Sequence, residues 1–146
     1  MSIDLSEEDM KAPFHLAFPV KSLGVTKMFY HEVLGCEIGR SCEHWMDFDF
    51  FGNQISAHVS NNSITELATS MVDDIEVPMR HFGVILSLDD WKKLAEKLKV
   101  AGIEFVMEPQ IRYKGMTGEQ HIMFLYDPSG NALEFKAFTN PNEVFE

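Results

Sequence analysis

Two halves of the 146-residue chain show the same order of strand-like and helix-like segments, and this internal repeat constrains the fold more than any other feature. Each half opens with an apolar strand-like run, at 14–20 and again at 81–86. Apolar residues at helical spacing follow, beginning after Ser22 in the first half and after Ser87 or Asp89 in the second. Three further strand-like runs complete each half: 36–41, 45–51 and 54–60 in the first, and 104–113, 120–126 and 132–138 in the second. The sequence therefore predicts an α+β fold of two paired βαβββ modules.

The repeat fits within one domain. With 146 residues and 45% hydrophobic content, the chain is long enough to bury a single core. The polar stretch between the modules has too little pattern for an assignment, and a link of that length is often functional, although a plain connector is an equal alternative. The predicted divisions are a flexible N-terminal arm (1–12) and a single domain (13–138), made of module one (13–60), a linker (61–80) and module two (81–138), followed by a C-terminal tail (139–146).

Two histidines and one glutamate occupy related positions in the repeat. His15 and His81 each stand near the start of the first strand of a half, and Glu134 lies in the last strand of the second half. Singly, a histidine in an apolar strand is more often a hydrogen-bonded core residue, and Glu134 could simply face solvent. Together, a pseudo-twofold relation between the halves brings equivalent strand positions face to face. We therefore expect the three side chains to converge on one point.

Two imidazoles and one carboxylate suit a divalent ion such as Fe²⁺, Mn²⁺, Zn²⁺, Ni²⁺ or Co²⁺. Three protein ligands leave coordination positions open for water or substrate, which is typical of a catalytic rather than a structural site. The predicted metal ligands are therefore His15, His81 and Glu134.

Several runs give the chain a family resemblance. His-Leu-Ala-Phe-Pro-Val at 15–20, His-Phe-Gly-Val at 81–84 and Asp-Pro-Ser-Gly-Asn-Ala-Leu-Glu-Phe at 127–135 are similar to the vicinal oxygen chelate (glyoxalase, bleomycin resistance protein and extradiol dioxygenase) superfamily. The resemblance covers roughly 13–138. It implies paired βαβββ modules whose mixed sheets curve around a metal cup, with ligands from the first strand of each module and the last strand of the second.

The resemblance also raises the question of a fourth ligand. Glyoxalase-type members commonly add a Glu or Gln from the last strand of the first module. Aligning the turns at Gly52 and Gly130 puts Ser56 opposite Glu134, and His58 lies two residues further along the same strand face. His58 is therefore a candidate fourth ligand after a one-rung shift or a bulge, or else an acid, base or hydrogen-bond partner in the pocket.

Arg112 and Tyr113 are further candidates for a catalytic role. They end a strand before the loop 114–118, which is positioned to close over the cup. An arginine there would clamp a carboxylate or phenolate through two hydrogen bonds, and a plain surface position is the alternative. Lys136 shares a strand face with Glu134, so it would pair with that carboxylate or meet an anionic substrate.

Three functions remain open, and all act on a small molecule. We favour a dioxygenase acting on two vicinal oxygens, because two His and one carboxylate leave adjacent sites open on Fe²⁺. A glyoxalase- or epimerase-type lyase or isomerase is the second, and the lack of a Glu near 56 counts against it. The third is a metal-free protein that sequesters a cationic drug, which becomes first if the three ligands do not converge. The charge of −11 fits it, but the complete ligand set argues against it.

Charge and length narrow the partners and the compartment. The 23 acidic against 12 basic residues argue against nucleic acid and anionic membrane surfaces. There is neither a signal-like N-terminus nor an apolar run of about 20 residues, and two cysteines are too few for a disulfide framework, so we expect a cytoplasmic protein. Aromatic strand faces and the short two-module chain predict a homodimer. The sequence leaves open whether modules pair within or between chains.

Overall fold

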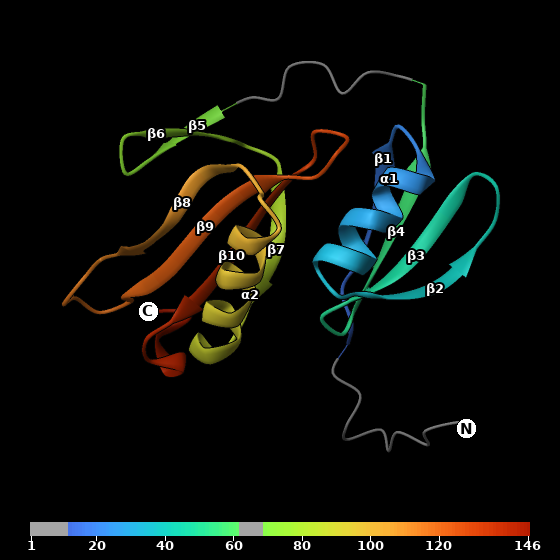
Figure 1. Cartoon of the computed structure of the whole chain (residues 1–146). Helices are drawn as coiled ribbons and strands as arrows, with labels where there is room; N and C mark the ends of the chain where they lie inside the picture. Colours follow the sequence, from blue (N-terminus) through green and yellow to red (C-terminus); the bar gives the residue numbers. More distant parts are fainter. Residues whose placement is uncertain (1–11, 62–68) are drawn as a thin grey trace.

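The computed structural model describes residues 12–61 and 69–146. Within these residues it contains two four-stranded sheets, each with its own helical segment, and a separate two-stranded hairpin (Figure 1). The predicted α+β fold of two βαβββ modules is confirmed. Residues 1–11 of the predicted N-terminal arm lie outside the described residues. The predicted C-terminal tail includes a short 3-10 helix, η2 (Pro141–Glu143).

Module one is a mixed sheet in the order β1-β4-β3-β2. The outer strand β1 runs parallel to β4, and the other pairs are antiparallel. The helix starts after Ser22 and changes to π-helical bonding, in which the Leu34 N–H donates to the Phe29 carbonyl at 2.9 Å. The elements are β1 (His15–Val20), α1 (Leu23–Lys27), η1 (Met28–Val33), β2 (Glu37–Ser41), β3 (Trp45–Phe50) and β4 (Asn53–Val59).

Module two repeats this topology in the order β7-β10-β9-β8. Here β7 runs parallel to β10, as β1 does to β4. Its helix begins at Ser87, whose hydroxyl accepts a hydrogen bond from the Asp90 N–H at 3.2 Å and caps the first turn. The matching strand orders establish the internal repeat. The elements are β7 (His81–Ile85), α2 (Leu88–Val100), β8 (Phe105–Arg112), β9 (Gln120–Tyr126) and β10 (Ala132–Phe138).

A β-hairpin forms in the second half of the predicted linker, directly before module two. It consists of β5 (Thr69–Val72) and β6 (Ile75–Pro78), joined by a two-residue turn at Asp73 and Asp74 with φ of 47° and 66°. Val77 is fully buried against Met107, Ile122 and Phe124, which belong to β8 and β9. The hairpin therefore covers part of one face of the module two sheet.

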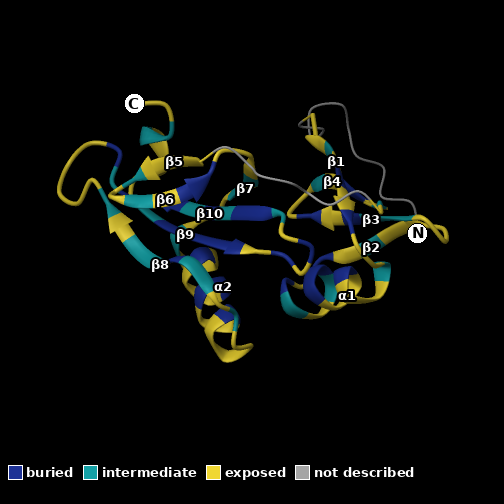
Figure 2. Cartoon of the chain, turned by 90° about the horizontal axis from the view of Figure 1, so that it is seen from above, coloured by how far each residue is buried: buried dark blue, intermediate teal, exposed yellow. Residues whose placement is uncertain are grey.

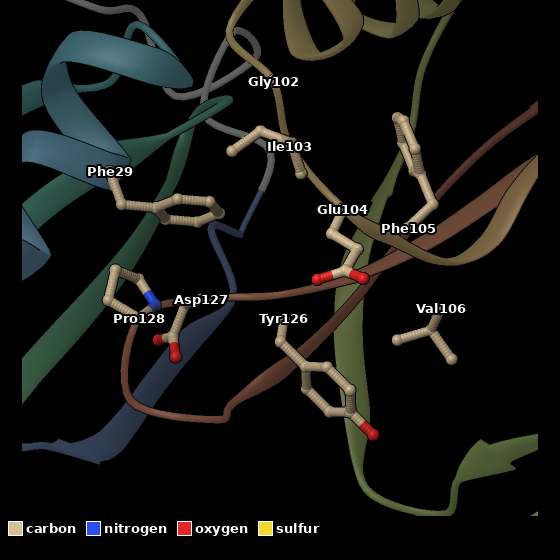
Figure 3. A pocket seen from close by; sticks show the side chains of 9 residues that line it. All are labelled: Phe29, Gly102, Ile103, Glu104, Phe105, Val106, Tyr126, Asp127 and Pro128. Atoms are coloured by element: carbon tan, nitrogen blue, oxygen red, sulfur yellow. The ribbon is translucent and has the colours of Figure 1, made fainter.

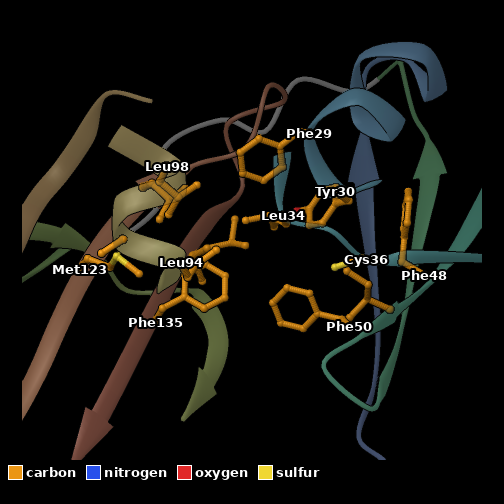
Figure 4. Close-up of a cluster of buried hydrophobic side chains, with 14 of the residues drawn as sticks. Phe29, Tyr30, Leu34, Cys36, Phe48, Phe50, Leu94, Leu98, Met123 and Phe135 are labelled. Atoms are coloured by element: carbon orange, nitrogen blue, oxygen red, sulfur yellow. The ribbon is translucent and has the colours of Figure 1, made fainter. Parts of the chain in front are cut away.

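The main core lies between the two sheets, where both helices pack. Side chains of both modules meet there, and Figure 4 shows Phe50 and Phe135 pointing toward each other from opposite sheets. Their rings are 5.9 Å apart. We call the sheet face that looks into this core the core face, and the opposite one the open face. Buried positions concentrate on β9 and β10, whereas β2 and β5 are largely exposed (Figure 2).

The turn between β9 and β10 fastens the modules together. Asp127 Oδ1 accepts from the backbone N–H groups of Ser129 and Asn131 at 2.9 and 2.8 Å, and Oδ2 accepts from the Tyr30 hydroxyl at 2.9 Å. The Asn131 amide reaches the Pro19 carbonyl at 2.9 Å. Burial, and then the Asp127 carboxylate, raises the pKa of Tyr30 well above its usual range. The Asp-Pro-Ser-Gly-Asn run is thus an inter-module latch.

Candidate metal centre

His81 and Glu134 meet on the open face of module two. Glu134 on β10 pairs with Gly83 on the parallel strand β7. His81 lies two residues before Gly83, and therefore on the same face of the sheet as Glu134. The His81 Nε2 and Glu134 Oε2 atoms are 3.1 Å apart, with side chains 29% and 13% exposed. Two donor atoms bound to one ion at about 2.0–2.2 Å have a similar separation. The structure therefore brings two of the three predicted ligands together.

The second nitrogen of His81 fixes which atom is available. Nδ1 lies 2.7 Å from the Pro78 carbonyl oxygen, which can only accept, so Nδ1 carries the proton of this hydrogen bond. In the neutral ring Nε2 then presents its lone pair to the Glu134 carboxylate, and two electron-pair donors so close need a shared proton or a cation between them. The ring also packs edge-on to Phe124 at 4.9 Å. This donor pair fits a divalent ion.

Glu134 also has a cationic neighbour. Lys136 Nζ lies 3.9 Å from Glu134 Oε1 on the same strand face, as expected from the sequence. On the opposite side Gly83 is in tight contact with β10, since a Cβ built there would lie 1.5 Å from the Glu134 carbonyl oxygen. Only glycine permits this approach of the two strands.

His15 lies on the open face of module one, at the start of β1 opposite Gln54. It is exposed. Among the described residues, no group of three His, Cys, Asp or Glu side chains is close enough to hold a metal ion. Within one chain the expected convergence of three ligands is therefore not found, because the helices occupy the space between the sheets and leave the open faces on the outer sides.

The register of module one agrees with the alignment of the turns. Ser56 pairs with Ala17, as Glu134 pairs with Gly83, so Ser56 takes the place of Glu134 in module one. His58 is exposed two residues further along, beside Trp45 on β3. Its role as ligand or pocket residue stays a prediction.

Arg112 and Tyr113 contact the hairpin turn. Arg112 Nε lies 3.3 Å from Asp73 Oδ1, and the guanidinium stacks 4.7 Å from the centre of the Tyr113 ring. Tyr113 itself has a φ of 56°, in the left-handed region. The observed contact ties β8 to the β5–β6 hairpin, and the binding of a substrate anion by Arg112 stays a prediction.

Two groups on the open faces were not predicted from the sequence, the Pro78 carbonyl and the Asp47 carboxylate. The Pro78 carbonyl orients His81, and a backbone carbonyl leaves no mark in a sequence. Asp47 on β3 accepts hydrogen bonds from Ser56 and Gln54 on β4. The alternation of Trp45 and Asp47 with buried Phe48 would have placed Asp47 on the open face.

A separate groove opens between the modules. It has a volume of about 590 Å³ and is lined by Phe29, Ile103, Glu104 and Tyr126 among others (Figure 3). None of the predicted ligands lines it, so it is distinct from the His81–Glu134 pair. No helix in the described part of the chain is long and apolar enough to cross a membrane.

Comparison with known proteins agrees with this geometry. A structure from Alicyclobacillus acidocaldarius, described as a glyoxalase/bleomycin resistance protein/dioxygenase, is 33% identical, covers 91% of this chain and 96% of its own, and has a TM-score of 0.77. The fosfomycin resistance protein FosX of Listeria monocytogenes has the same fold at 19% identity (92% and 99% covered, TM-score 0.69). So has a virulence protein of Salmonella typhimurium at 23% identity (89% and 98%, TM-score 0.61).

No curated protein matches the chain significantly. The family model described as Glyoxalase/Bleomycin resistance protein/Dioxygenase superfamily matches residues 13–135. This match spans both modules, from before His15 to just beyond Glu134. The repeat, the paired sheets and the matched residues agree, and the chain belongs to the glyoxalase/bleomycin resistance protein/dioxygenase superfamily.

Proposed function

We propose that this chain is a divalent-metal-dependent enzyme whose site is completed by a second copy of itself. The observation that carries the proposal is the His81–Glu134 pair, with Nε2 and Oε2 3.1 Å apart and Nδ1 of His81 held by the Pro78 carbonyl. A bound ion would polarise two vicinal oxygens of a small substrate and, if it is Fe²⁺, leave an adjacent position for O₂.

The third ligand in this proposal is His15 of the second copy. His15 holds in module one the position that His81 holds in module two, on an exposed open face. In the proposed twofold dimer, the open face of module one in each copy packs against the open face of module two in the other copy. This contact occurs twice in the dimer. Such a dimer would hold two identical sites, each built from both chains, and the proposal therefore requires the predicted homodimer.

The roles of this chain's residues follow from their positions. His81 and Glu134 hold the ion, and Lys136 attracts an anionic substrate to the side of Glu134 away from His81. His58 reaches the site from the facing module as a hydrogen-bond partner. The hairpin excludes water from the wall formed by Phe124 and Ile122. A dioxygenase fits the two-histidine, one-carboxylate donor set, and it is the reaction we propose.

Mixing of variants tests the composite site directly. His15→Ala and Glu134→Ala dimers are each expected to take up little Mn²⁺ or Fe²⁺, measured by elemental analysis after chelator-free purification. A dimer formed from one chain of each kind has one intact site, so random mixing restores about a quarter of the wild-type metal. No recovery, with mixed dimers demonstrated by mass spectrometry, would rule out a site shared between chains.

Two further readouts complete the test. Light scattering should give twice the 16.7 kDa chain mass. Oxygen uptake with a set of catechols then tests the reaction, with His81→Ala as the inactive control. Full metal content without oxygen uptake would leave the lyase or isomerase class in place of the dioxygenase. A wild-type protein that binds no metal would instead favour the drug-sequestering function.

A further inference from the structure

The centre of the module one open face carries one carboxylate, that of Asp47. Asp47 on β3 is in register with Ser56 on β4, and Ser56 with Ala17 on β1. On the other side a Cβ at Gly39 would lie 3.3 Å from the Asp47 Cβ. The neighbours across the sheet are therefore small, and Asp47 is half-buried, with part of its side chain accessible.

Two side chains of β4 orient this carboxylate. The buried Ser56 hydroxyl donates to Asp47 Oδ1 at 2.6 Å, and the Gln54 amide donates to Oδ2 at 3.4 Å. The first bond is short and the second is long, so Oδ1 is committed while Oδ2 keeps most of its capacity to accept. Such an arrangement holds a carboxylate in place and leaves Oδ2 able to accept a further hydrogen bond.

Comparison with module two shows which row of the sheet Asp47 occupies. The row Ala17, Ser56, Asp47 corresponds to Gly83, Glu134, Phe124. Asp47 Oδ1 lies 2.6 Å from Ser56 Oγ. Module one thus has a carboxylate in the row that holds Glu134 in module two, rooted on the neighbouring strand about 4.8 Å away.

We propose that Asp47 is the proton acceptor of the composite site, oriented by Ser56 and Gln54, and that it is not a metal ligand. The inference rests on the proposed function, since it needs the module one face to meet the His81–Glu134 pair of the second copy. When a vicinal diol or catechol binds, one O–H bond breaks. The oxygen keeps the electron pair, and the proton moves to Asp47 Oδ2, which holds it while the ligand is bound and gives it to water when the ligand leaves.

The charged groups around Asp47 leave it the best placed base on this face. Asp49 is the next residue on the same face of β3, but it is exposed and its Oδ1 accepts from the Gly52 N–H at 2.8 Å. Glu37 on β2 pairs with Asp49, one row away from Asp47. His15 and His58 belong to the rows on either side. Asp49 is therefore a matched control, with the same side chain on the same strand face.

The experiment uses the Mn²⁺-loaded dimer and 4-nitrocatechol, a chelating probe whose absorption spectrum changes with each ionisation. In slightly acidic buffer we expect wild type and Asp49→Asn to bind the probe fully deprotonated. Asp47→Asn should bind it about tenfold more weakly, a loss of about 1.4 kcal/mol, with the spectrum of a probe that keeps one proton. Ser56→Ala should be intermediate. With a catechol that the enzyme oxidises, the rate of oxygen uptake should be about 10²-fold lower in Asp47→Asn than in wild type.

Metal affinity, measured by titration calorimetry with Mn²⁺, separates the outcomes. Equal affinity in wild type and Asp47→Asn, with a large loss in Glu134→Gln, is the expected result. An equal loss in Asp47→Asn would make Asp47 a ligand and overturn the proposal. The proposal would also be overturned if Asp47→Asn and Asp49→Asn bound the probe equally well and with the same spectrum. The proposed metal site would then still stand. A wild type without Mn²⁺ affinity would remove the proposed function and this inference together.

Discussion

The two open faces have the same backbone and opposite chemistry. Module two presents a ligand pair beside apolar Phe124 and Ile122, and the β5–β6 hairpin covers part of it. Module one presents the polar row of Ser56 and Asp47, and none of the described residues forms a comparable cover over it. In the proposed function, the duplicated sheet divides one site into a metal-holding half and a polar half. Neither half is complete alone.

Gly83 gives the largest contrast between the modules. Its equivalent in module one is Ala17, which tolerates a Cβ, whereas a Cβ at 83 would overlap the Glu134 carbonyl. Gly83→Ala should therefore push β7 from β10 and lower the free energy of unfolding by about 4 kcal/mol. Ala17→Gly is the control, with a loss of about 1 kcal/mol. Urea unfolding measures both, and a wild-type-like Gly83→Ala would show that the close approach is relaxed in solution.

The second contrast is between the turns. The β9–β10 turn latches onto module one through Asp127, while the equivalent turn at Phe51 and Gly52 is exposed. Asp127→Ala leaves buried N–H groups without their acceptor and should lower the free energy of unfolding by about 3 kcal/mol. Tyr30→Phe removes one hydroxyl from the same network and should cost about 1 kcal/mol. Equal effects in thermal unfolding would mean that the tyrosine contact carries the whole latch.

The hairpin cover is the third contrast. Val77 is fully buried under it, so Val77→Ala should lower the free energy of unfolding by about 2 kcal/mol. Because the hairpin also carries Pro78, whose carbonyl holds His81, metal affinity should fall as well. Val25→Ala, at a position 47% exposed, is the control and should stay within about 0.5 kcal/mol. Val77→Ala with unchanged stability and metal uptake would mean that the hairpin is only a connector.

The smallest effect concerns a pair of equivalent histidines. His121 packs against Trp91 at 5.2 Å, whereas its counterpart His44 is exposed. Burial, and then the charge of Lys92, lowers the pKa of His121 below its ordinary value of 6.5. Its contribution to stability is therefore full above about pH 6.5 and is lost as the pH falls through the lowered folded value. His121→Gln should flatten this part of the stability profile, measured by urea unfolding across pH, and His44→Gln should leave it as in wild type.

Much of the fold could be predicted because it depends on local periodicity. The helix cap at Ser87 or Asp89 (Ser87 in the structure), the strands around His15 and His81, and the equivalence of Ser56 with Glu134 all follow from spacing and turn residues. The hairpin at 69–78 could not, because its strands are only four residues long and half of their residues are exposed. A role for Asp47 could not be predicted, because a lone acidic residue in a strand usually faces solvent. Only its hydrogen bonds to β4 distinguish it from such a residue.

The sequence by itself determined which residues share a strand face, since side chains alternate along every strand and the repeat sets the topology twice. It therefore put His81 and Glu134 on one face and His15 on the matching face of the other module. Tertiary structure alone decided where those faces point. The apolar sides of both helices and both sheets are buried together between the modules, and this long-range packing turns the two open faces outward. The two halves of the proposed site are therefore separate in a single chain.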